Sequence, residues 1–230
     1  MLQNKKILAI IPARAGSKRV KNKNIRPLGD KPLIQWTIDT AKKSKYIDSI
    51  YVSTDSSEIQ NIAKNLSVDA EPLRSTKLAG DTAKTSDVIV DIVKNLKPEY
   101  DIVLLLQPTS PFRSVVSIDE ALEFYFKKEA KSVVSVSESS APLAWTFHLD
   151  ETMHMNNFVK NLKEGRSQDL QMTYHLNGAI YIVGVKEFLA AESFYFSEDT
   201  YGYSMKKVES IDIDTEEDFE FAQRISSSFL

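Results

Sequence analysis

Short apolar runs alternate with amphipathic stretches along most of the chain. Strand-like runs occupy residues 7–11, 49–53, 102–106, 132–136, 177–183 and 208–213. Helical spacing of apolar side chains predicts helices over 31–43, 56–65, 86–96, 117–127, 186–191 and 216–225. Ser117 and Glu120 have the capping-box spacing at the start of one of these helices. This rhythm predicts an α/β fold with a mostly parallel sheet and helices on both faces.

The rhythm breaks between residues 137 and 174. Pro142, Trp145 and Phe147 are scattered through a polar, irregular stretch there. We interpret it as an excursion from the sheet, either a hairpin or a dimerisation arm. Because the chain has no internal repeat, low-complexity tract or linker, we expect residues 1–230 to form one domain.

The amino-acid composition excludes several classes of function. The formal net charge of −3 gives no basic field that would favour nucleic acid as the main partner. The absence of cysteine excludes disulfides, thiolate metal sites and cysteine nucleophiles. No run approaches the length of a membrane span, and the apolar run at 7–11 is too short for a signal peptide. We therefore expect a soluble, cytoplasmic protein.

A basic loop follows the first predicted strand. It holds five cations, namely Arg14, Lys18, Arg19, Lys21 and Lys23. Gly16 permits a tight turn, and small neighbours leave backbone N–H groups open to phosphate oxygens. A solvated basic loop is the simpler alternative, but ligands bind such sheets at the carboxyl ends of strands. The loop matches neither the P-loop nor the dinucleotide-binding pattern.

A stiff turn follows the strand predicted at 102–106. Two prolines in the segment Q-P-T-S-P-F-R, residues 107–113, restrict where Gln107 and Arg113 point. An ordinary turn at the end of a strand is the alternative interpretation.

Two carboxylates stand two residues apart near the C-terminus, at Asp212 and Asp214. If 208–213 is a strand, its pleat places both on one face. Such a pair can hold Mg²⁺ together with water and substrate oxygens. The alternative is an acidic first turn that favours the dipole of the helix at 216–225.

These segments resemble one known family. The strings I-P-A-R-A-G-S-K (11–18), K-N (23–24), K-P-L (31–33) and Q-P-T-S-P-F-R are similar to the acylneuraminate cytidylyltransferases, the CMP-sialic acid synthetases, and the resemblance covers nearly the whole chain. It implies a Rossmann-like nucleotide-diphospho-sugar transferase fold. It also implies that the first loop wraps the phosphates of CTP, through Arg14, Ala15, Gly16, Ser17, Lys18, Lys23 and Asn24.

The resemblance assigns further residues. It implies that Arg74 and Thr85 help to recognise the nucleotide, with a surface arginine and a helix cap as the alternatives. It implies Mg²⁺ at Asp212 and Asp214. The implied sugar-binding residues are Gln107, Arg166, Gln168, Asn177 and Tyr181. Ser167 stands where well-known members carry an arginine, which leaves the identity of the sugar open.

The implied reaction joins CMP from CTP to a nine-carbon sugar acid of the N-acetylneuraminate or legionaminate type and releases pyrophosphate. Lys18, Arg14 and Asp214 are the implied catalytic residues. Pseudaminate or Kdo as the sugar, and a non-catalytic nucleotide-binding regulator on the same fold, are the alternatives. The excursion at 137–174 resembles an arm through which family members dimerise, so we expect a homodimer.

Overall fold

The computed structural model describes residues 2–80, 82–96, 99–149, 151–162, 166 and 169–229. Its strands are β1 (Ile7–Pro12), β2 (Pro27–Leu28), β3 (Lys31–Pro32), β4 (Ser49–Ser53), β5 (Ile102–Leu106), β6 (Ser132–Glu138), β7 (Tyr174–Gly184) and β8 (Thr200–Met205). Its α-helices are α1 (Leu33–Lys43), α2 (Ser57–Asn65), α3 (Thr76–Ala79), α4 (Thr85–Asn95), α5 (Val115–Lys127), α6 (Asn156–Asn161), α7 (Val185–Ala191) and α8 (Glu216–Ile225). Short 3₁₀ turns occupy η1 (Lys23–Ile25), η2 (Leu143–Trp145), η4 (Lys207–Ser210) and η5 (Ser226–Phe229).

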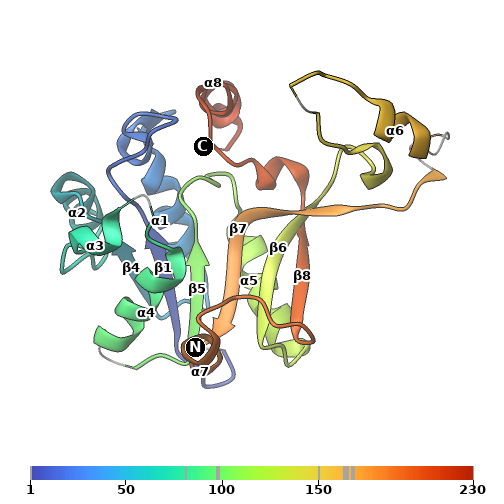
Figure 1. Cartoon of the computed structure of the whole chain (residues 1–230). Coiled ribbons are helices and arrows are strands. Elements are labelled where there is room, and N and C mark those ends of the chain that lie inside the picture. Colours follow the sequence, from blue (N-terminus) through green and yellow to red (C-terminus); the bar gives the residue numbers. More distant parts are fainter. Residues whose placement is uncertain are drawn as a thin grey trace.

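A six-stranded sheet in the order β4-β1-β5-β7-β6-β8 forms the centre of the molecule (Figure 1). Strand β1 runs parallel to β4 and β5, and β6 runs parallel to β8. Strand β7 is antiparallel to both of its neighbours. The α/β expectation of a mostly parallel sheet is confirmed. The carboxyl ends of β4, β1 and β5 meet at one edge, where the loops that follow these strands lie together.

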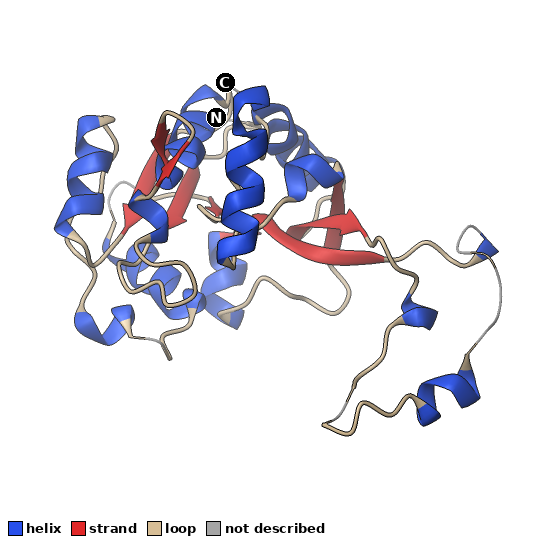
Figure 2. Ribbon diagram, turned by 90° about the horizontal axis from the view of Figure 1, so that it is seen from above, coloured by secondary structure: helices blue, strands red, loops and turns tan. Residues whose placement is uncertain are grey.

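Both faces of the sheet are covered, because alternate side chains of each strand point to opposite sides. Ile7, Ala9 and Ile11 of β1 pack with buried side chains of α1, α2 and α5. Leu8 and Ile10 of the same strand pack with buried side chains of α4 and α7. All five of these strand residues are at most 1% exposed, so they lie in the interior. Both views show helices on either side of the sheet (Figures 1 and 2).

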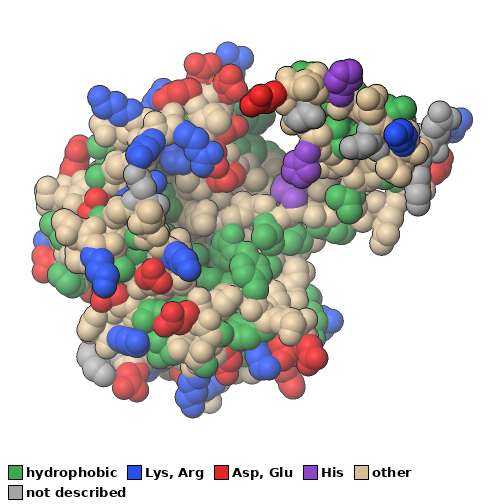
Figure 3. Space-filling model, in the orientation of Figure 1, with side chains coloured by type: hydrophobic (Ala, Val, Ile, Leu, Met, Phe, Trp, Pro, Cys, Tyr) green, Lys and Arg blue, Asp and Glu red, His purple; other side chains and the backbone are tan. Residues whose placement is uncertain are grey.

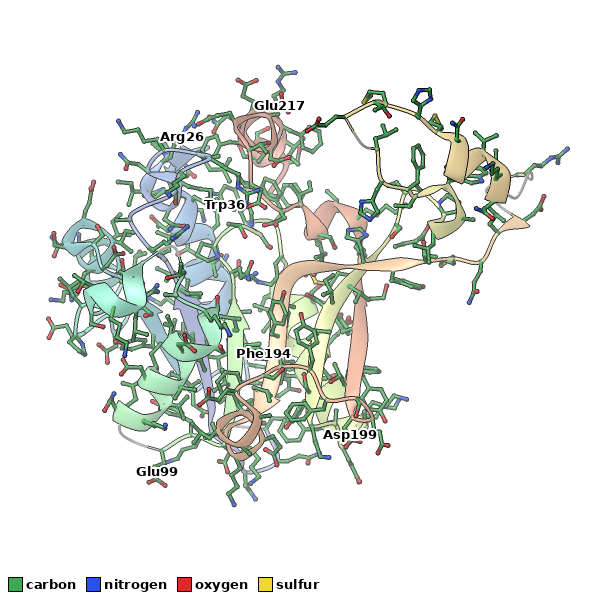
Figure 4. The ribbon with its side chains drawn as sticks, viewed as in Figure 1. Arg26, Trp36, Glu99, Phe194, Asp199 and Glu217 are labelled. Carbon is green, nitrogen blue, oxygen red and sulfur yellow. The ribbon has the colours of Figure 1, made fainter. Side chains whose placement is uncertain are left out.

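A third, smaller core lies at the carboxyl edge of the sheet. It joins Val20 of the basic loop, Phe112 of the 107–113 turn and Ile213 of the acidic segment. Trp36 packs edge-on against Phe112 with ring centroids 5.7 Å apart, beneath α8 in the view of Figure 4. This packing holds three loops from distant parts of the chain against one another.

One predicted strand is wrong. Residues 208–213 form η4 and an extended segment, and the strand that pairs with β6 is β8. The reason is that the backbone of Ile213 bonds outside the sheet, since its N–H donates to the carbonyl oxygen of Thr109 at 2.8 Å. The apolar Ile213 is buried in the third core instead of in a sheet. The pleat of a strand therefore does not orient Asp212 and Asp214.

The predicted capping box at Ser117 is also wrong. Helix α5 begins at Val115, and its N-cap is Ser114, whose hydroxyl accepts a hydrogen bond from the backbone N–H of Ser117. The hydroxyl of Ser117 instead donates to the carboxylate of Glu209 in η4. Glu120 accepts a hydrogen bond from Tyr203 of β8 at 2.7 Å. Both capping-box residues are thus used for contacts between elements.

The excursion leaves the sheet as expected. Strands β6 and β7 stay paired to the edge of the sheet, where Val136, Ser137 and Glu138 face Leu176, His175 and Tyr174. The chain beyond them, with η2 and α6, projects from the body in both ribbon views (Figures 1 and 2). We call residues 139–173 the arm. Among the described residues, no helix combines the length and the apolar character needed to cross a membrane.

Candidate active site

A cavity of about 350 Å³ opens at the carboxyl ends of β1 and β5. Its polar and charged lining residues are Arg14, Ser17, Lys18, Arg19, Lys23, Asn24, Arg74, Thr85, Gln107, Thr109 and Asp214. Pro12, Val20, Leu78, Gly80, Ala83, Val88 and Pro108 complete the lining. Several Lys and Arg side chains gather at this end of the molecule in Figure 3. Loops far apart in the sequence thus form one basic hollow.

The basic loop is held open by bonds from its backbone to the neighbouring strand end. Ala13 N–H donates to the carbonyl oxygen of Ser53 at 2.8 Å, and Ala15 N–H donates to Oδ1 of Asp55 at 2.9 Å. The buried Asn24 side chain donates to the carbonyl oxygen of Arg14 at 3.0 Å. Asn24 therefore supports the phosphate-binding loop expected at this place as well as lining the cavity.

The tight turn expected at Gly16 is present, since the N–H of Ser17 donates to the carbonyl oxygen of Ala15 at 2.9 Å. The φ angle of Gly16 lies outside the left-handed region, and a Cβ added there would meet no protein atom within 4 Å. Nothing in the described protein requires glycine at this position. The missing side chain leaves open space beside the backbone of Ala15 and Ser17, as the approach of a phosphate group would require.

Arg74 is fastened to the end of β4. Its Nε lies 3.1 Å from the hydroxyl of Ser53, and its Nη2 donates to the carbonyl oxygen of Ser53 at 2.6 Å. Burial lowers the pKa of the Arg74 guanidinium, while the carboxylate of Asp55 opposes this shift and the positive Arg14 adds to it. Arg74 thus brings a preorganised positive charge to the same cavity as Lys18 and Lys23, from a distant part of the sequence.

Apolar and small side chains from α3, α4 and the segment between them form one wall, with Leu78, Gly80, Ala83 and Val88. Thr85 is the first residue of α4, and Lys84 rather than Thr85 occupies the N-cap position. A flat base can lie against such a wall, beside the hydroxyl of Thr85. The cavity therefore offers a charged part and an apolar part, as a nucleoside phosphate requires.

Asp214 lines the cavity among the cations. Its Oδ2 lies 3.1 Å from Nη2 of Arg19, and its Oδ1 lies 3.4 Å from Nζ of Lys23. Asp212 is not part of the lining, although the segment is held to the 107–113 turn by the bond from Ile213 to Thr109. Asp212 is exposed, yet partial desolvation by the surrounding protein raises the pKa of its carboxyl; the nearby side chain of Thr109 opposes the shift, and the charge of Asp214 increases it.

This donor set fits a hard divalent cation. Two carboxylates whose mutual repulsion raises a pKa gain from a cation between them, and Mg²⁺ commonly takes one or two carboxylates plus phosphate oxygens and water. Among the described residues, no group of three or more His, Cys, Asp or Glu side chains could hold a metal on its own. A metal here would therefore need ligands from a bound substrate.

Gln107 joins the cavity to β7. A Cβ added at Gly178, where φ is +74°, would lie 3.1 Å from Oε1 of Gln107. Tyr181 lies further along β7, with its ring centroid 5.3 Å from that of Phe194, which Figure 4 places in front of the sheet. Burial raises the pKa of Tyr181 to about 12, with smaller contributions from Tyr195 and Asp212.

The remaining expected sugar contacts do not line the cavity. Asn177 is 4% exposed, and its amide bonds with Ser135 (2.5 Å) and Ser210 (2.9 Å). Arg166 lies in the arm and is exposed. Gln168 lies outside the described residues. Within the described part of the chain, the cavity is thus lined by the residues expected to bind the nucleotide except Ala15 and Gly16, and it receives only Gln107 from the expected sugar-binding set.

Three features of this region have no site role that the sequence predicts. Arg19 was recognised only as one of five loop cations, but it pairs with Asp214. The small residues Gly80 and Ala83 form part of the wall, and no motif marks them. Arg113 is fully buried beneath the 107–113 turn. The pairing of Arg19 with Asp214 and the burial of Arg113 depend on contacts between segments far apart in the sequence. The only sequence signal for any of these features is the high number of cations in the first loop.

A Rossmann-like mixed sheet with a cation-lined cavity beside an aspartate pair defines the class of nucleotide-dependent transferases. A family model described as cytidylyltransferase matches residues 8–228, so this chain belongs to the cytidylyltransferase family and is a nucleotidyltransferase. The family resemblance inferred from the motifs is confirmed.

Named relatives agree with the family. The chain is 40% identical over 230 residues to the CMP-N,N'-diacetyllegionaminic acid synthase of Legionella pneumophila, covering 96% of each chain. It is 38% identical over 218 residues to the N-acylneuraminate cytidylyltransferase of Escherichia coli O18:K1:H7, which covers 94% of this chain. That match spans 51% of the E. coli protein, about half of its length.

A solved structure agrees with the fold. The structure of CMP:2-keto-3-deoxy-manno-octonic acid synthetase complexed with CTP superposes with a TM-score of 0.75 and covers 98% of this chain and 100% of its own. The sequence identity is 15%, so this likeness concerns the fold alone.

Proposed function

We propose that this chain transfers CMP from CTP to the anomeric hydroxyl of a nine-carbon sugar acid and releases pyrophosphate. The observation that carries the proposal is the cavity itself, in which Lys18, Lys23 and Arg74 surround a hollow that also contains Asp214. Relatives named for CMP transfer to such sugar acids, at 40% and 38% identity, support the same reaction.

The proposed roles follow from position. The loop residues Arg14, Ala15, Gly16, Ser17, Lys18 and Lys23 bind the triphosphate, and Asn24 holds the loop through the carbonyl oxygen of Arg14. Arg74 and Thr85 contact the nucleoside beside the apolar wall. Because negative charge accumulates on the leaving pyrophosphate, cations already in place lower the barrier without reorganising during the reaction. Lys18 and Arg14 supply this stabilisation.

The chemical step is a displacement at phosphorus. The oxygen of the sugar hydroxyl forms a bond to the α-phosphorus, the bond from that phosphorus to the bridging oxygen breaks, and pyrophosphate leaves with the electron pair. Positioning of the two substrates provides most of the acceleration in such transfers. The hydroxyl transfers its proton to Asp214, the carboxylate among the described lining residues.

We propose Mg²⁺ as the metal, held by Asp212 and Asp214. When bound, it neutralises charge on the phosphate oxygens. In the structure described here, Arg19 and Lys23 pair with Asp214, so this carboxylate is already oriented toward the phosphate-binding loop.

For the sugar we favour the N-acetylneuraminate or legionaminate type, with pseudaminate as the alternative within the class. Gln107 offers an amide that both donates and accepts hydrogen bonds, which suits a polyhydroxylated sugar with amide substituents. Tyr181 adds a hydroxyl on the same side of the molecule. Arg166, Gln168 and Asn177 remain proposed members of the sugar site, Asn177 through its support of β7.

We further propose that the protein acts as a cytoplasmic homodimer. Large apolar side chains stand exposed on the arm and its base, with Leu143 at 72% and Met172 at 59% exposure. Apolar surface of this kind favours burial against another chain. A second copy could then bring Arg166 of its arm toward the side of the cavity that this chain leaves incomplete.

The test is pyrophosphate release from CTP with Mg²⁺ and a panel of N-acetylneuraminate, legionaminate, pseudaminate and Kdo. Release with a nine-carbon acid, and none with Kdo or after chelation of the metal, is the expected result. CTP binding without release for any of these sugars would instead support a non-catalytic regulator.

A further inference from the structure

Arg113 is buried without an anionic partner. It is 2% exposed, and no carboxylate pairs with its guanidinium among the residues that the structure describes. Its Nε has no hydrogen-bond partner, and the buried hydroxyl of Ser110 in the same turn has none either. Buried polar groups are almost always bonded, and buried charges are usually paired. A purely structural residue at this position would not need a charge.

The guanidinium connects the three elements beside the sugar side of the cavity. Its Nη1 donates to the carbonyl oxygens of Ala179 (2.7 Å) and Gln107 (3.3 Å), and its Nη2 donates to the hydroxyl of Thr37 at 3.0 Å. Gln107 directly follows β5, Ala179 lies in β7, and Thr37 lies in α1. Arg113 thus fixes the end of β5 against β7.

The two carbonyl groups that accept hydrogen bonds from Arg113 lie close to the point where the side chain of Gln107 approaches β7. One belongs to Gln107 itself and the other to Ala179. Ala179 directly follows Gly178, and the side-chain oxygen of Gln107 lies only 3.1 Å from the position that a Cβ of Gly178 would take. The backbone of Gln107 and the backbone next to Gly178 are therefore held by one rigid, planar group. The direction in which the side-chain amide of Gln107 points therefore depends on the guanidinium of Arg113.

The charge matters as well as the geometry. In the low-dielectric interior a cation without a counter-ion produces a potential that solvent screens only weakly. Burial lowers the pKa of Arg113 to about 9, so the group remains positively charged at neutral pH. The substrate that we propose is an acid, and its negative charge would be attracted toward the Gln107 side of the cavity.

We propose that Arg113 is a positioning residue for the sugar acid, because it aims Gln107 and supplies a positive potential behind it. The inference rests on the proposed function, since it requires an anionic sugar that binds beside Gln107. It assigns no contact between Arg113 and substrate. A merely structural role would change stability alone, whereas this role predicts a defect confined to the sugar.

The experiment compares steady-state kinetics of Arg113→Met, Arg113→Lys, Gln107→Ala and the double variant Arg113→Met/Gln107→Ala. For Arg113→Met we expect KM for the sugar to rise about 10-fold or more, with KM for CTP changed less than about twofold. Arg113→Lys, which keeps the charge but not the fork, should fall between wild type and Arg113→Met. The double variant should be no worse than Gln107→Ala, because both changes remove the same interaction.

A lower melting temperature with unchanged sugar KM in Arg113→Met would overturn the inference, and so would additive effects in the double variant. If Arg113→Met does not fold, Arg113→Lys decides, since an unchanged sugar KM in that variant would contradict the role equally. Failure of the proposed function looks different. In that case the wild-type chain itself releases no pyrophosphate with any sugar acid, and the inference falls with it.

Discussion

The ammonium group of Lys23 lies 3.4 Å from Oδ1 of Asp214 and donates a 2.6 Å hydrogen bond to the carbonyl oxygen of Ile213. Lys23 is a half-buried member of the loop that follows the first strand, and Asp214 precedes the last helix. This contact brings the proposed phosphate-binding loop and the proposed metal ligand together before any substrate is bound. Several expected outcomes depend on this arrangement.

Replacement of Asp214 by alanine is expected to abolish most activity without unfolding the protein. Asp214 lines the cavity, and loss of a metal ligand removes charge neutralisation worth several kcal/mol, so kcat/KM should fall about 100-fold or more. Pyrophosphate release at varied Mg²⁺ concentration measures the effect. Glu217→Gln, an exposed change on α8, is the matched control. Undiminished Mg²⁺-dependent turnover in Asp214→Ala would refute the metal assignment.

Replacement of Lys18 by alanine is expected to lower kcat. A positioned cation that stabilises developing charge contributes roughly a 10²- to 10³-fold rate effect. Lys21 belongs to the same loop but does not line the cavity, so Lys21→Ala should leave kcat nearly unchanged. Single-turnover measurements at saturating CTP separate this effect from nucleotide binding. If Lys18→Ala changed only the affinity for the sugar, Lys18 would not have the proposed phosphate role.

Replacement of Asn177 by alanine is expected to destabilise the fold. The change leaves the buried hydroxyl of Ser135 and the half-buried hydroxyl of Ser210 each short of one bond, and such losses cost about 1–3 kcal/mol in the free energy of unfolding. Urea denaturation measures the change. Ser135→Ala should destabilise in the same direction, and the double variant should lose less than the sum, because both positions share one network. Strict additivity would show that the network is not cooperative.

The stability of the protein should depend on Asp101 in acid. The backbone N–H of Lys6 and the ammonium of Lys5 lower the pKa of Asp101 below its ordinary value of 3.8, and partial burial opposes them. The folded state thus binds this proton less tightly than the unfolded state. The stabilisation is present above about pH 3.8 and is lost as the pH falls through the folded pKa.

Asp101→Asn should accordingly lower the free energy of unfolding at pH 7 by less than about 1 kcal/mol, because solvent screens a carboxyl that is 38% exposed, and the difference from wild type should shrink below pH 3.8. Urea titrations at pH 7 and pH 3 check this. Activity should not change, because Asp101 lies at the opposite end of β5 from the cavity. A difference that grew toward low pH would have the wrong sign.

The arm should mediate self-association. Light scattering of the wild-type chain should give twice the 26.0 kDa mass of one chain. Leu143→Glu or Met172→Glu should weaken the dimer, because a charge replaces exposed apolar surface on the arm. Val116→Glu, an equally apolar and exposed site on α5, is the control and should remain dimeric. A wild-type monomer at micromolar concentration would contradict the proposed dimer.

Local patterns predicted much of the fold. The apolar runs at 7–11, 49–53, 102–106 and 132–136 are strands in the structure, and the helices fall within a few residues of their expected positions. Each of these elements is specified by neighbours in the sequence. The strand expected at 208–213 was wrong because alternating apolar side chains also suit an extended segment that packs against loops.

The sequence by itself determined the α/β class, the cation-rich loop after the first strand and the presence of a carboxylate pair, because composition and periodicity within short windows carry that information. Only the tertiary structure decided which side chains meet. The pairing of Lys23 with Asp214, the burial of Arg113 against Ala179 and the insertion of β7 antiparallel into the sheet join residues many positions apart. Such contacts depend on how the whole chain packs, and no local pattern specifies them.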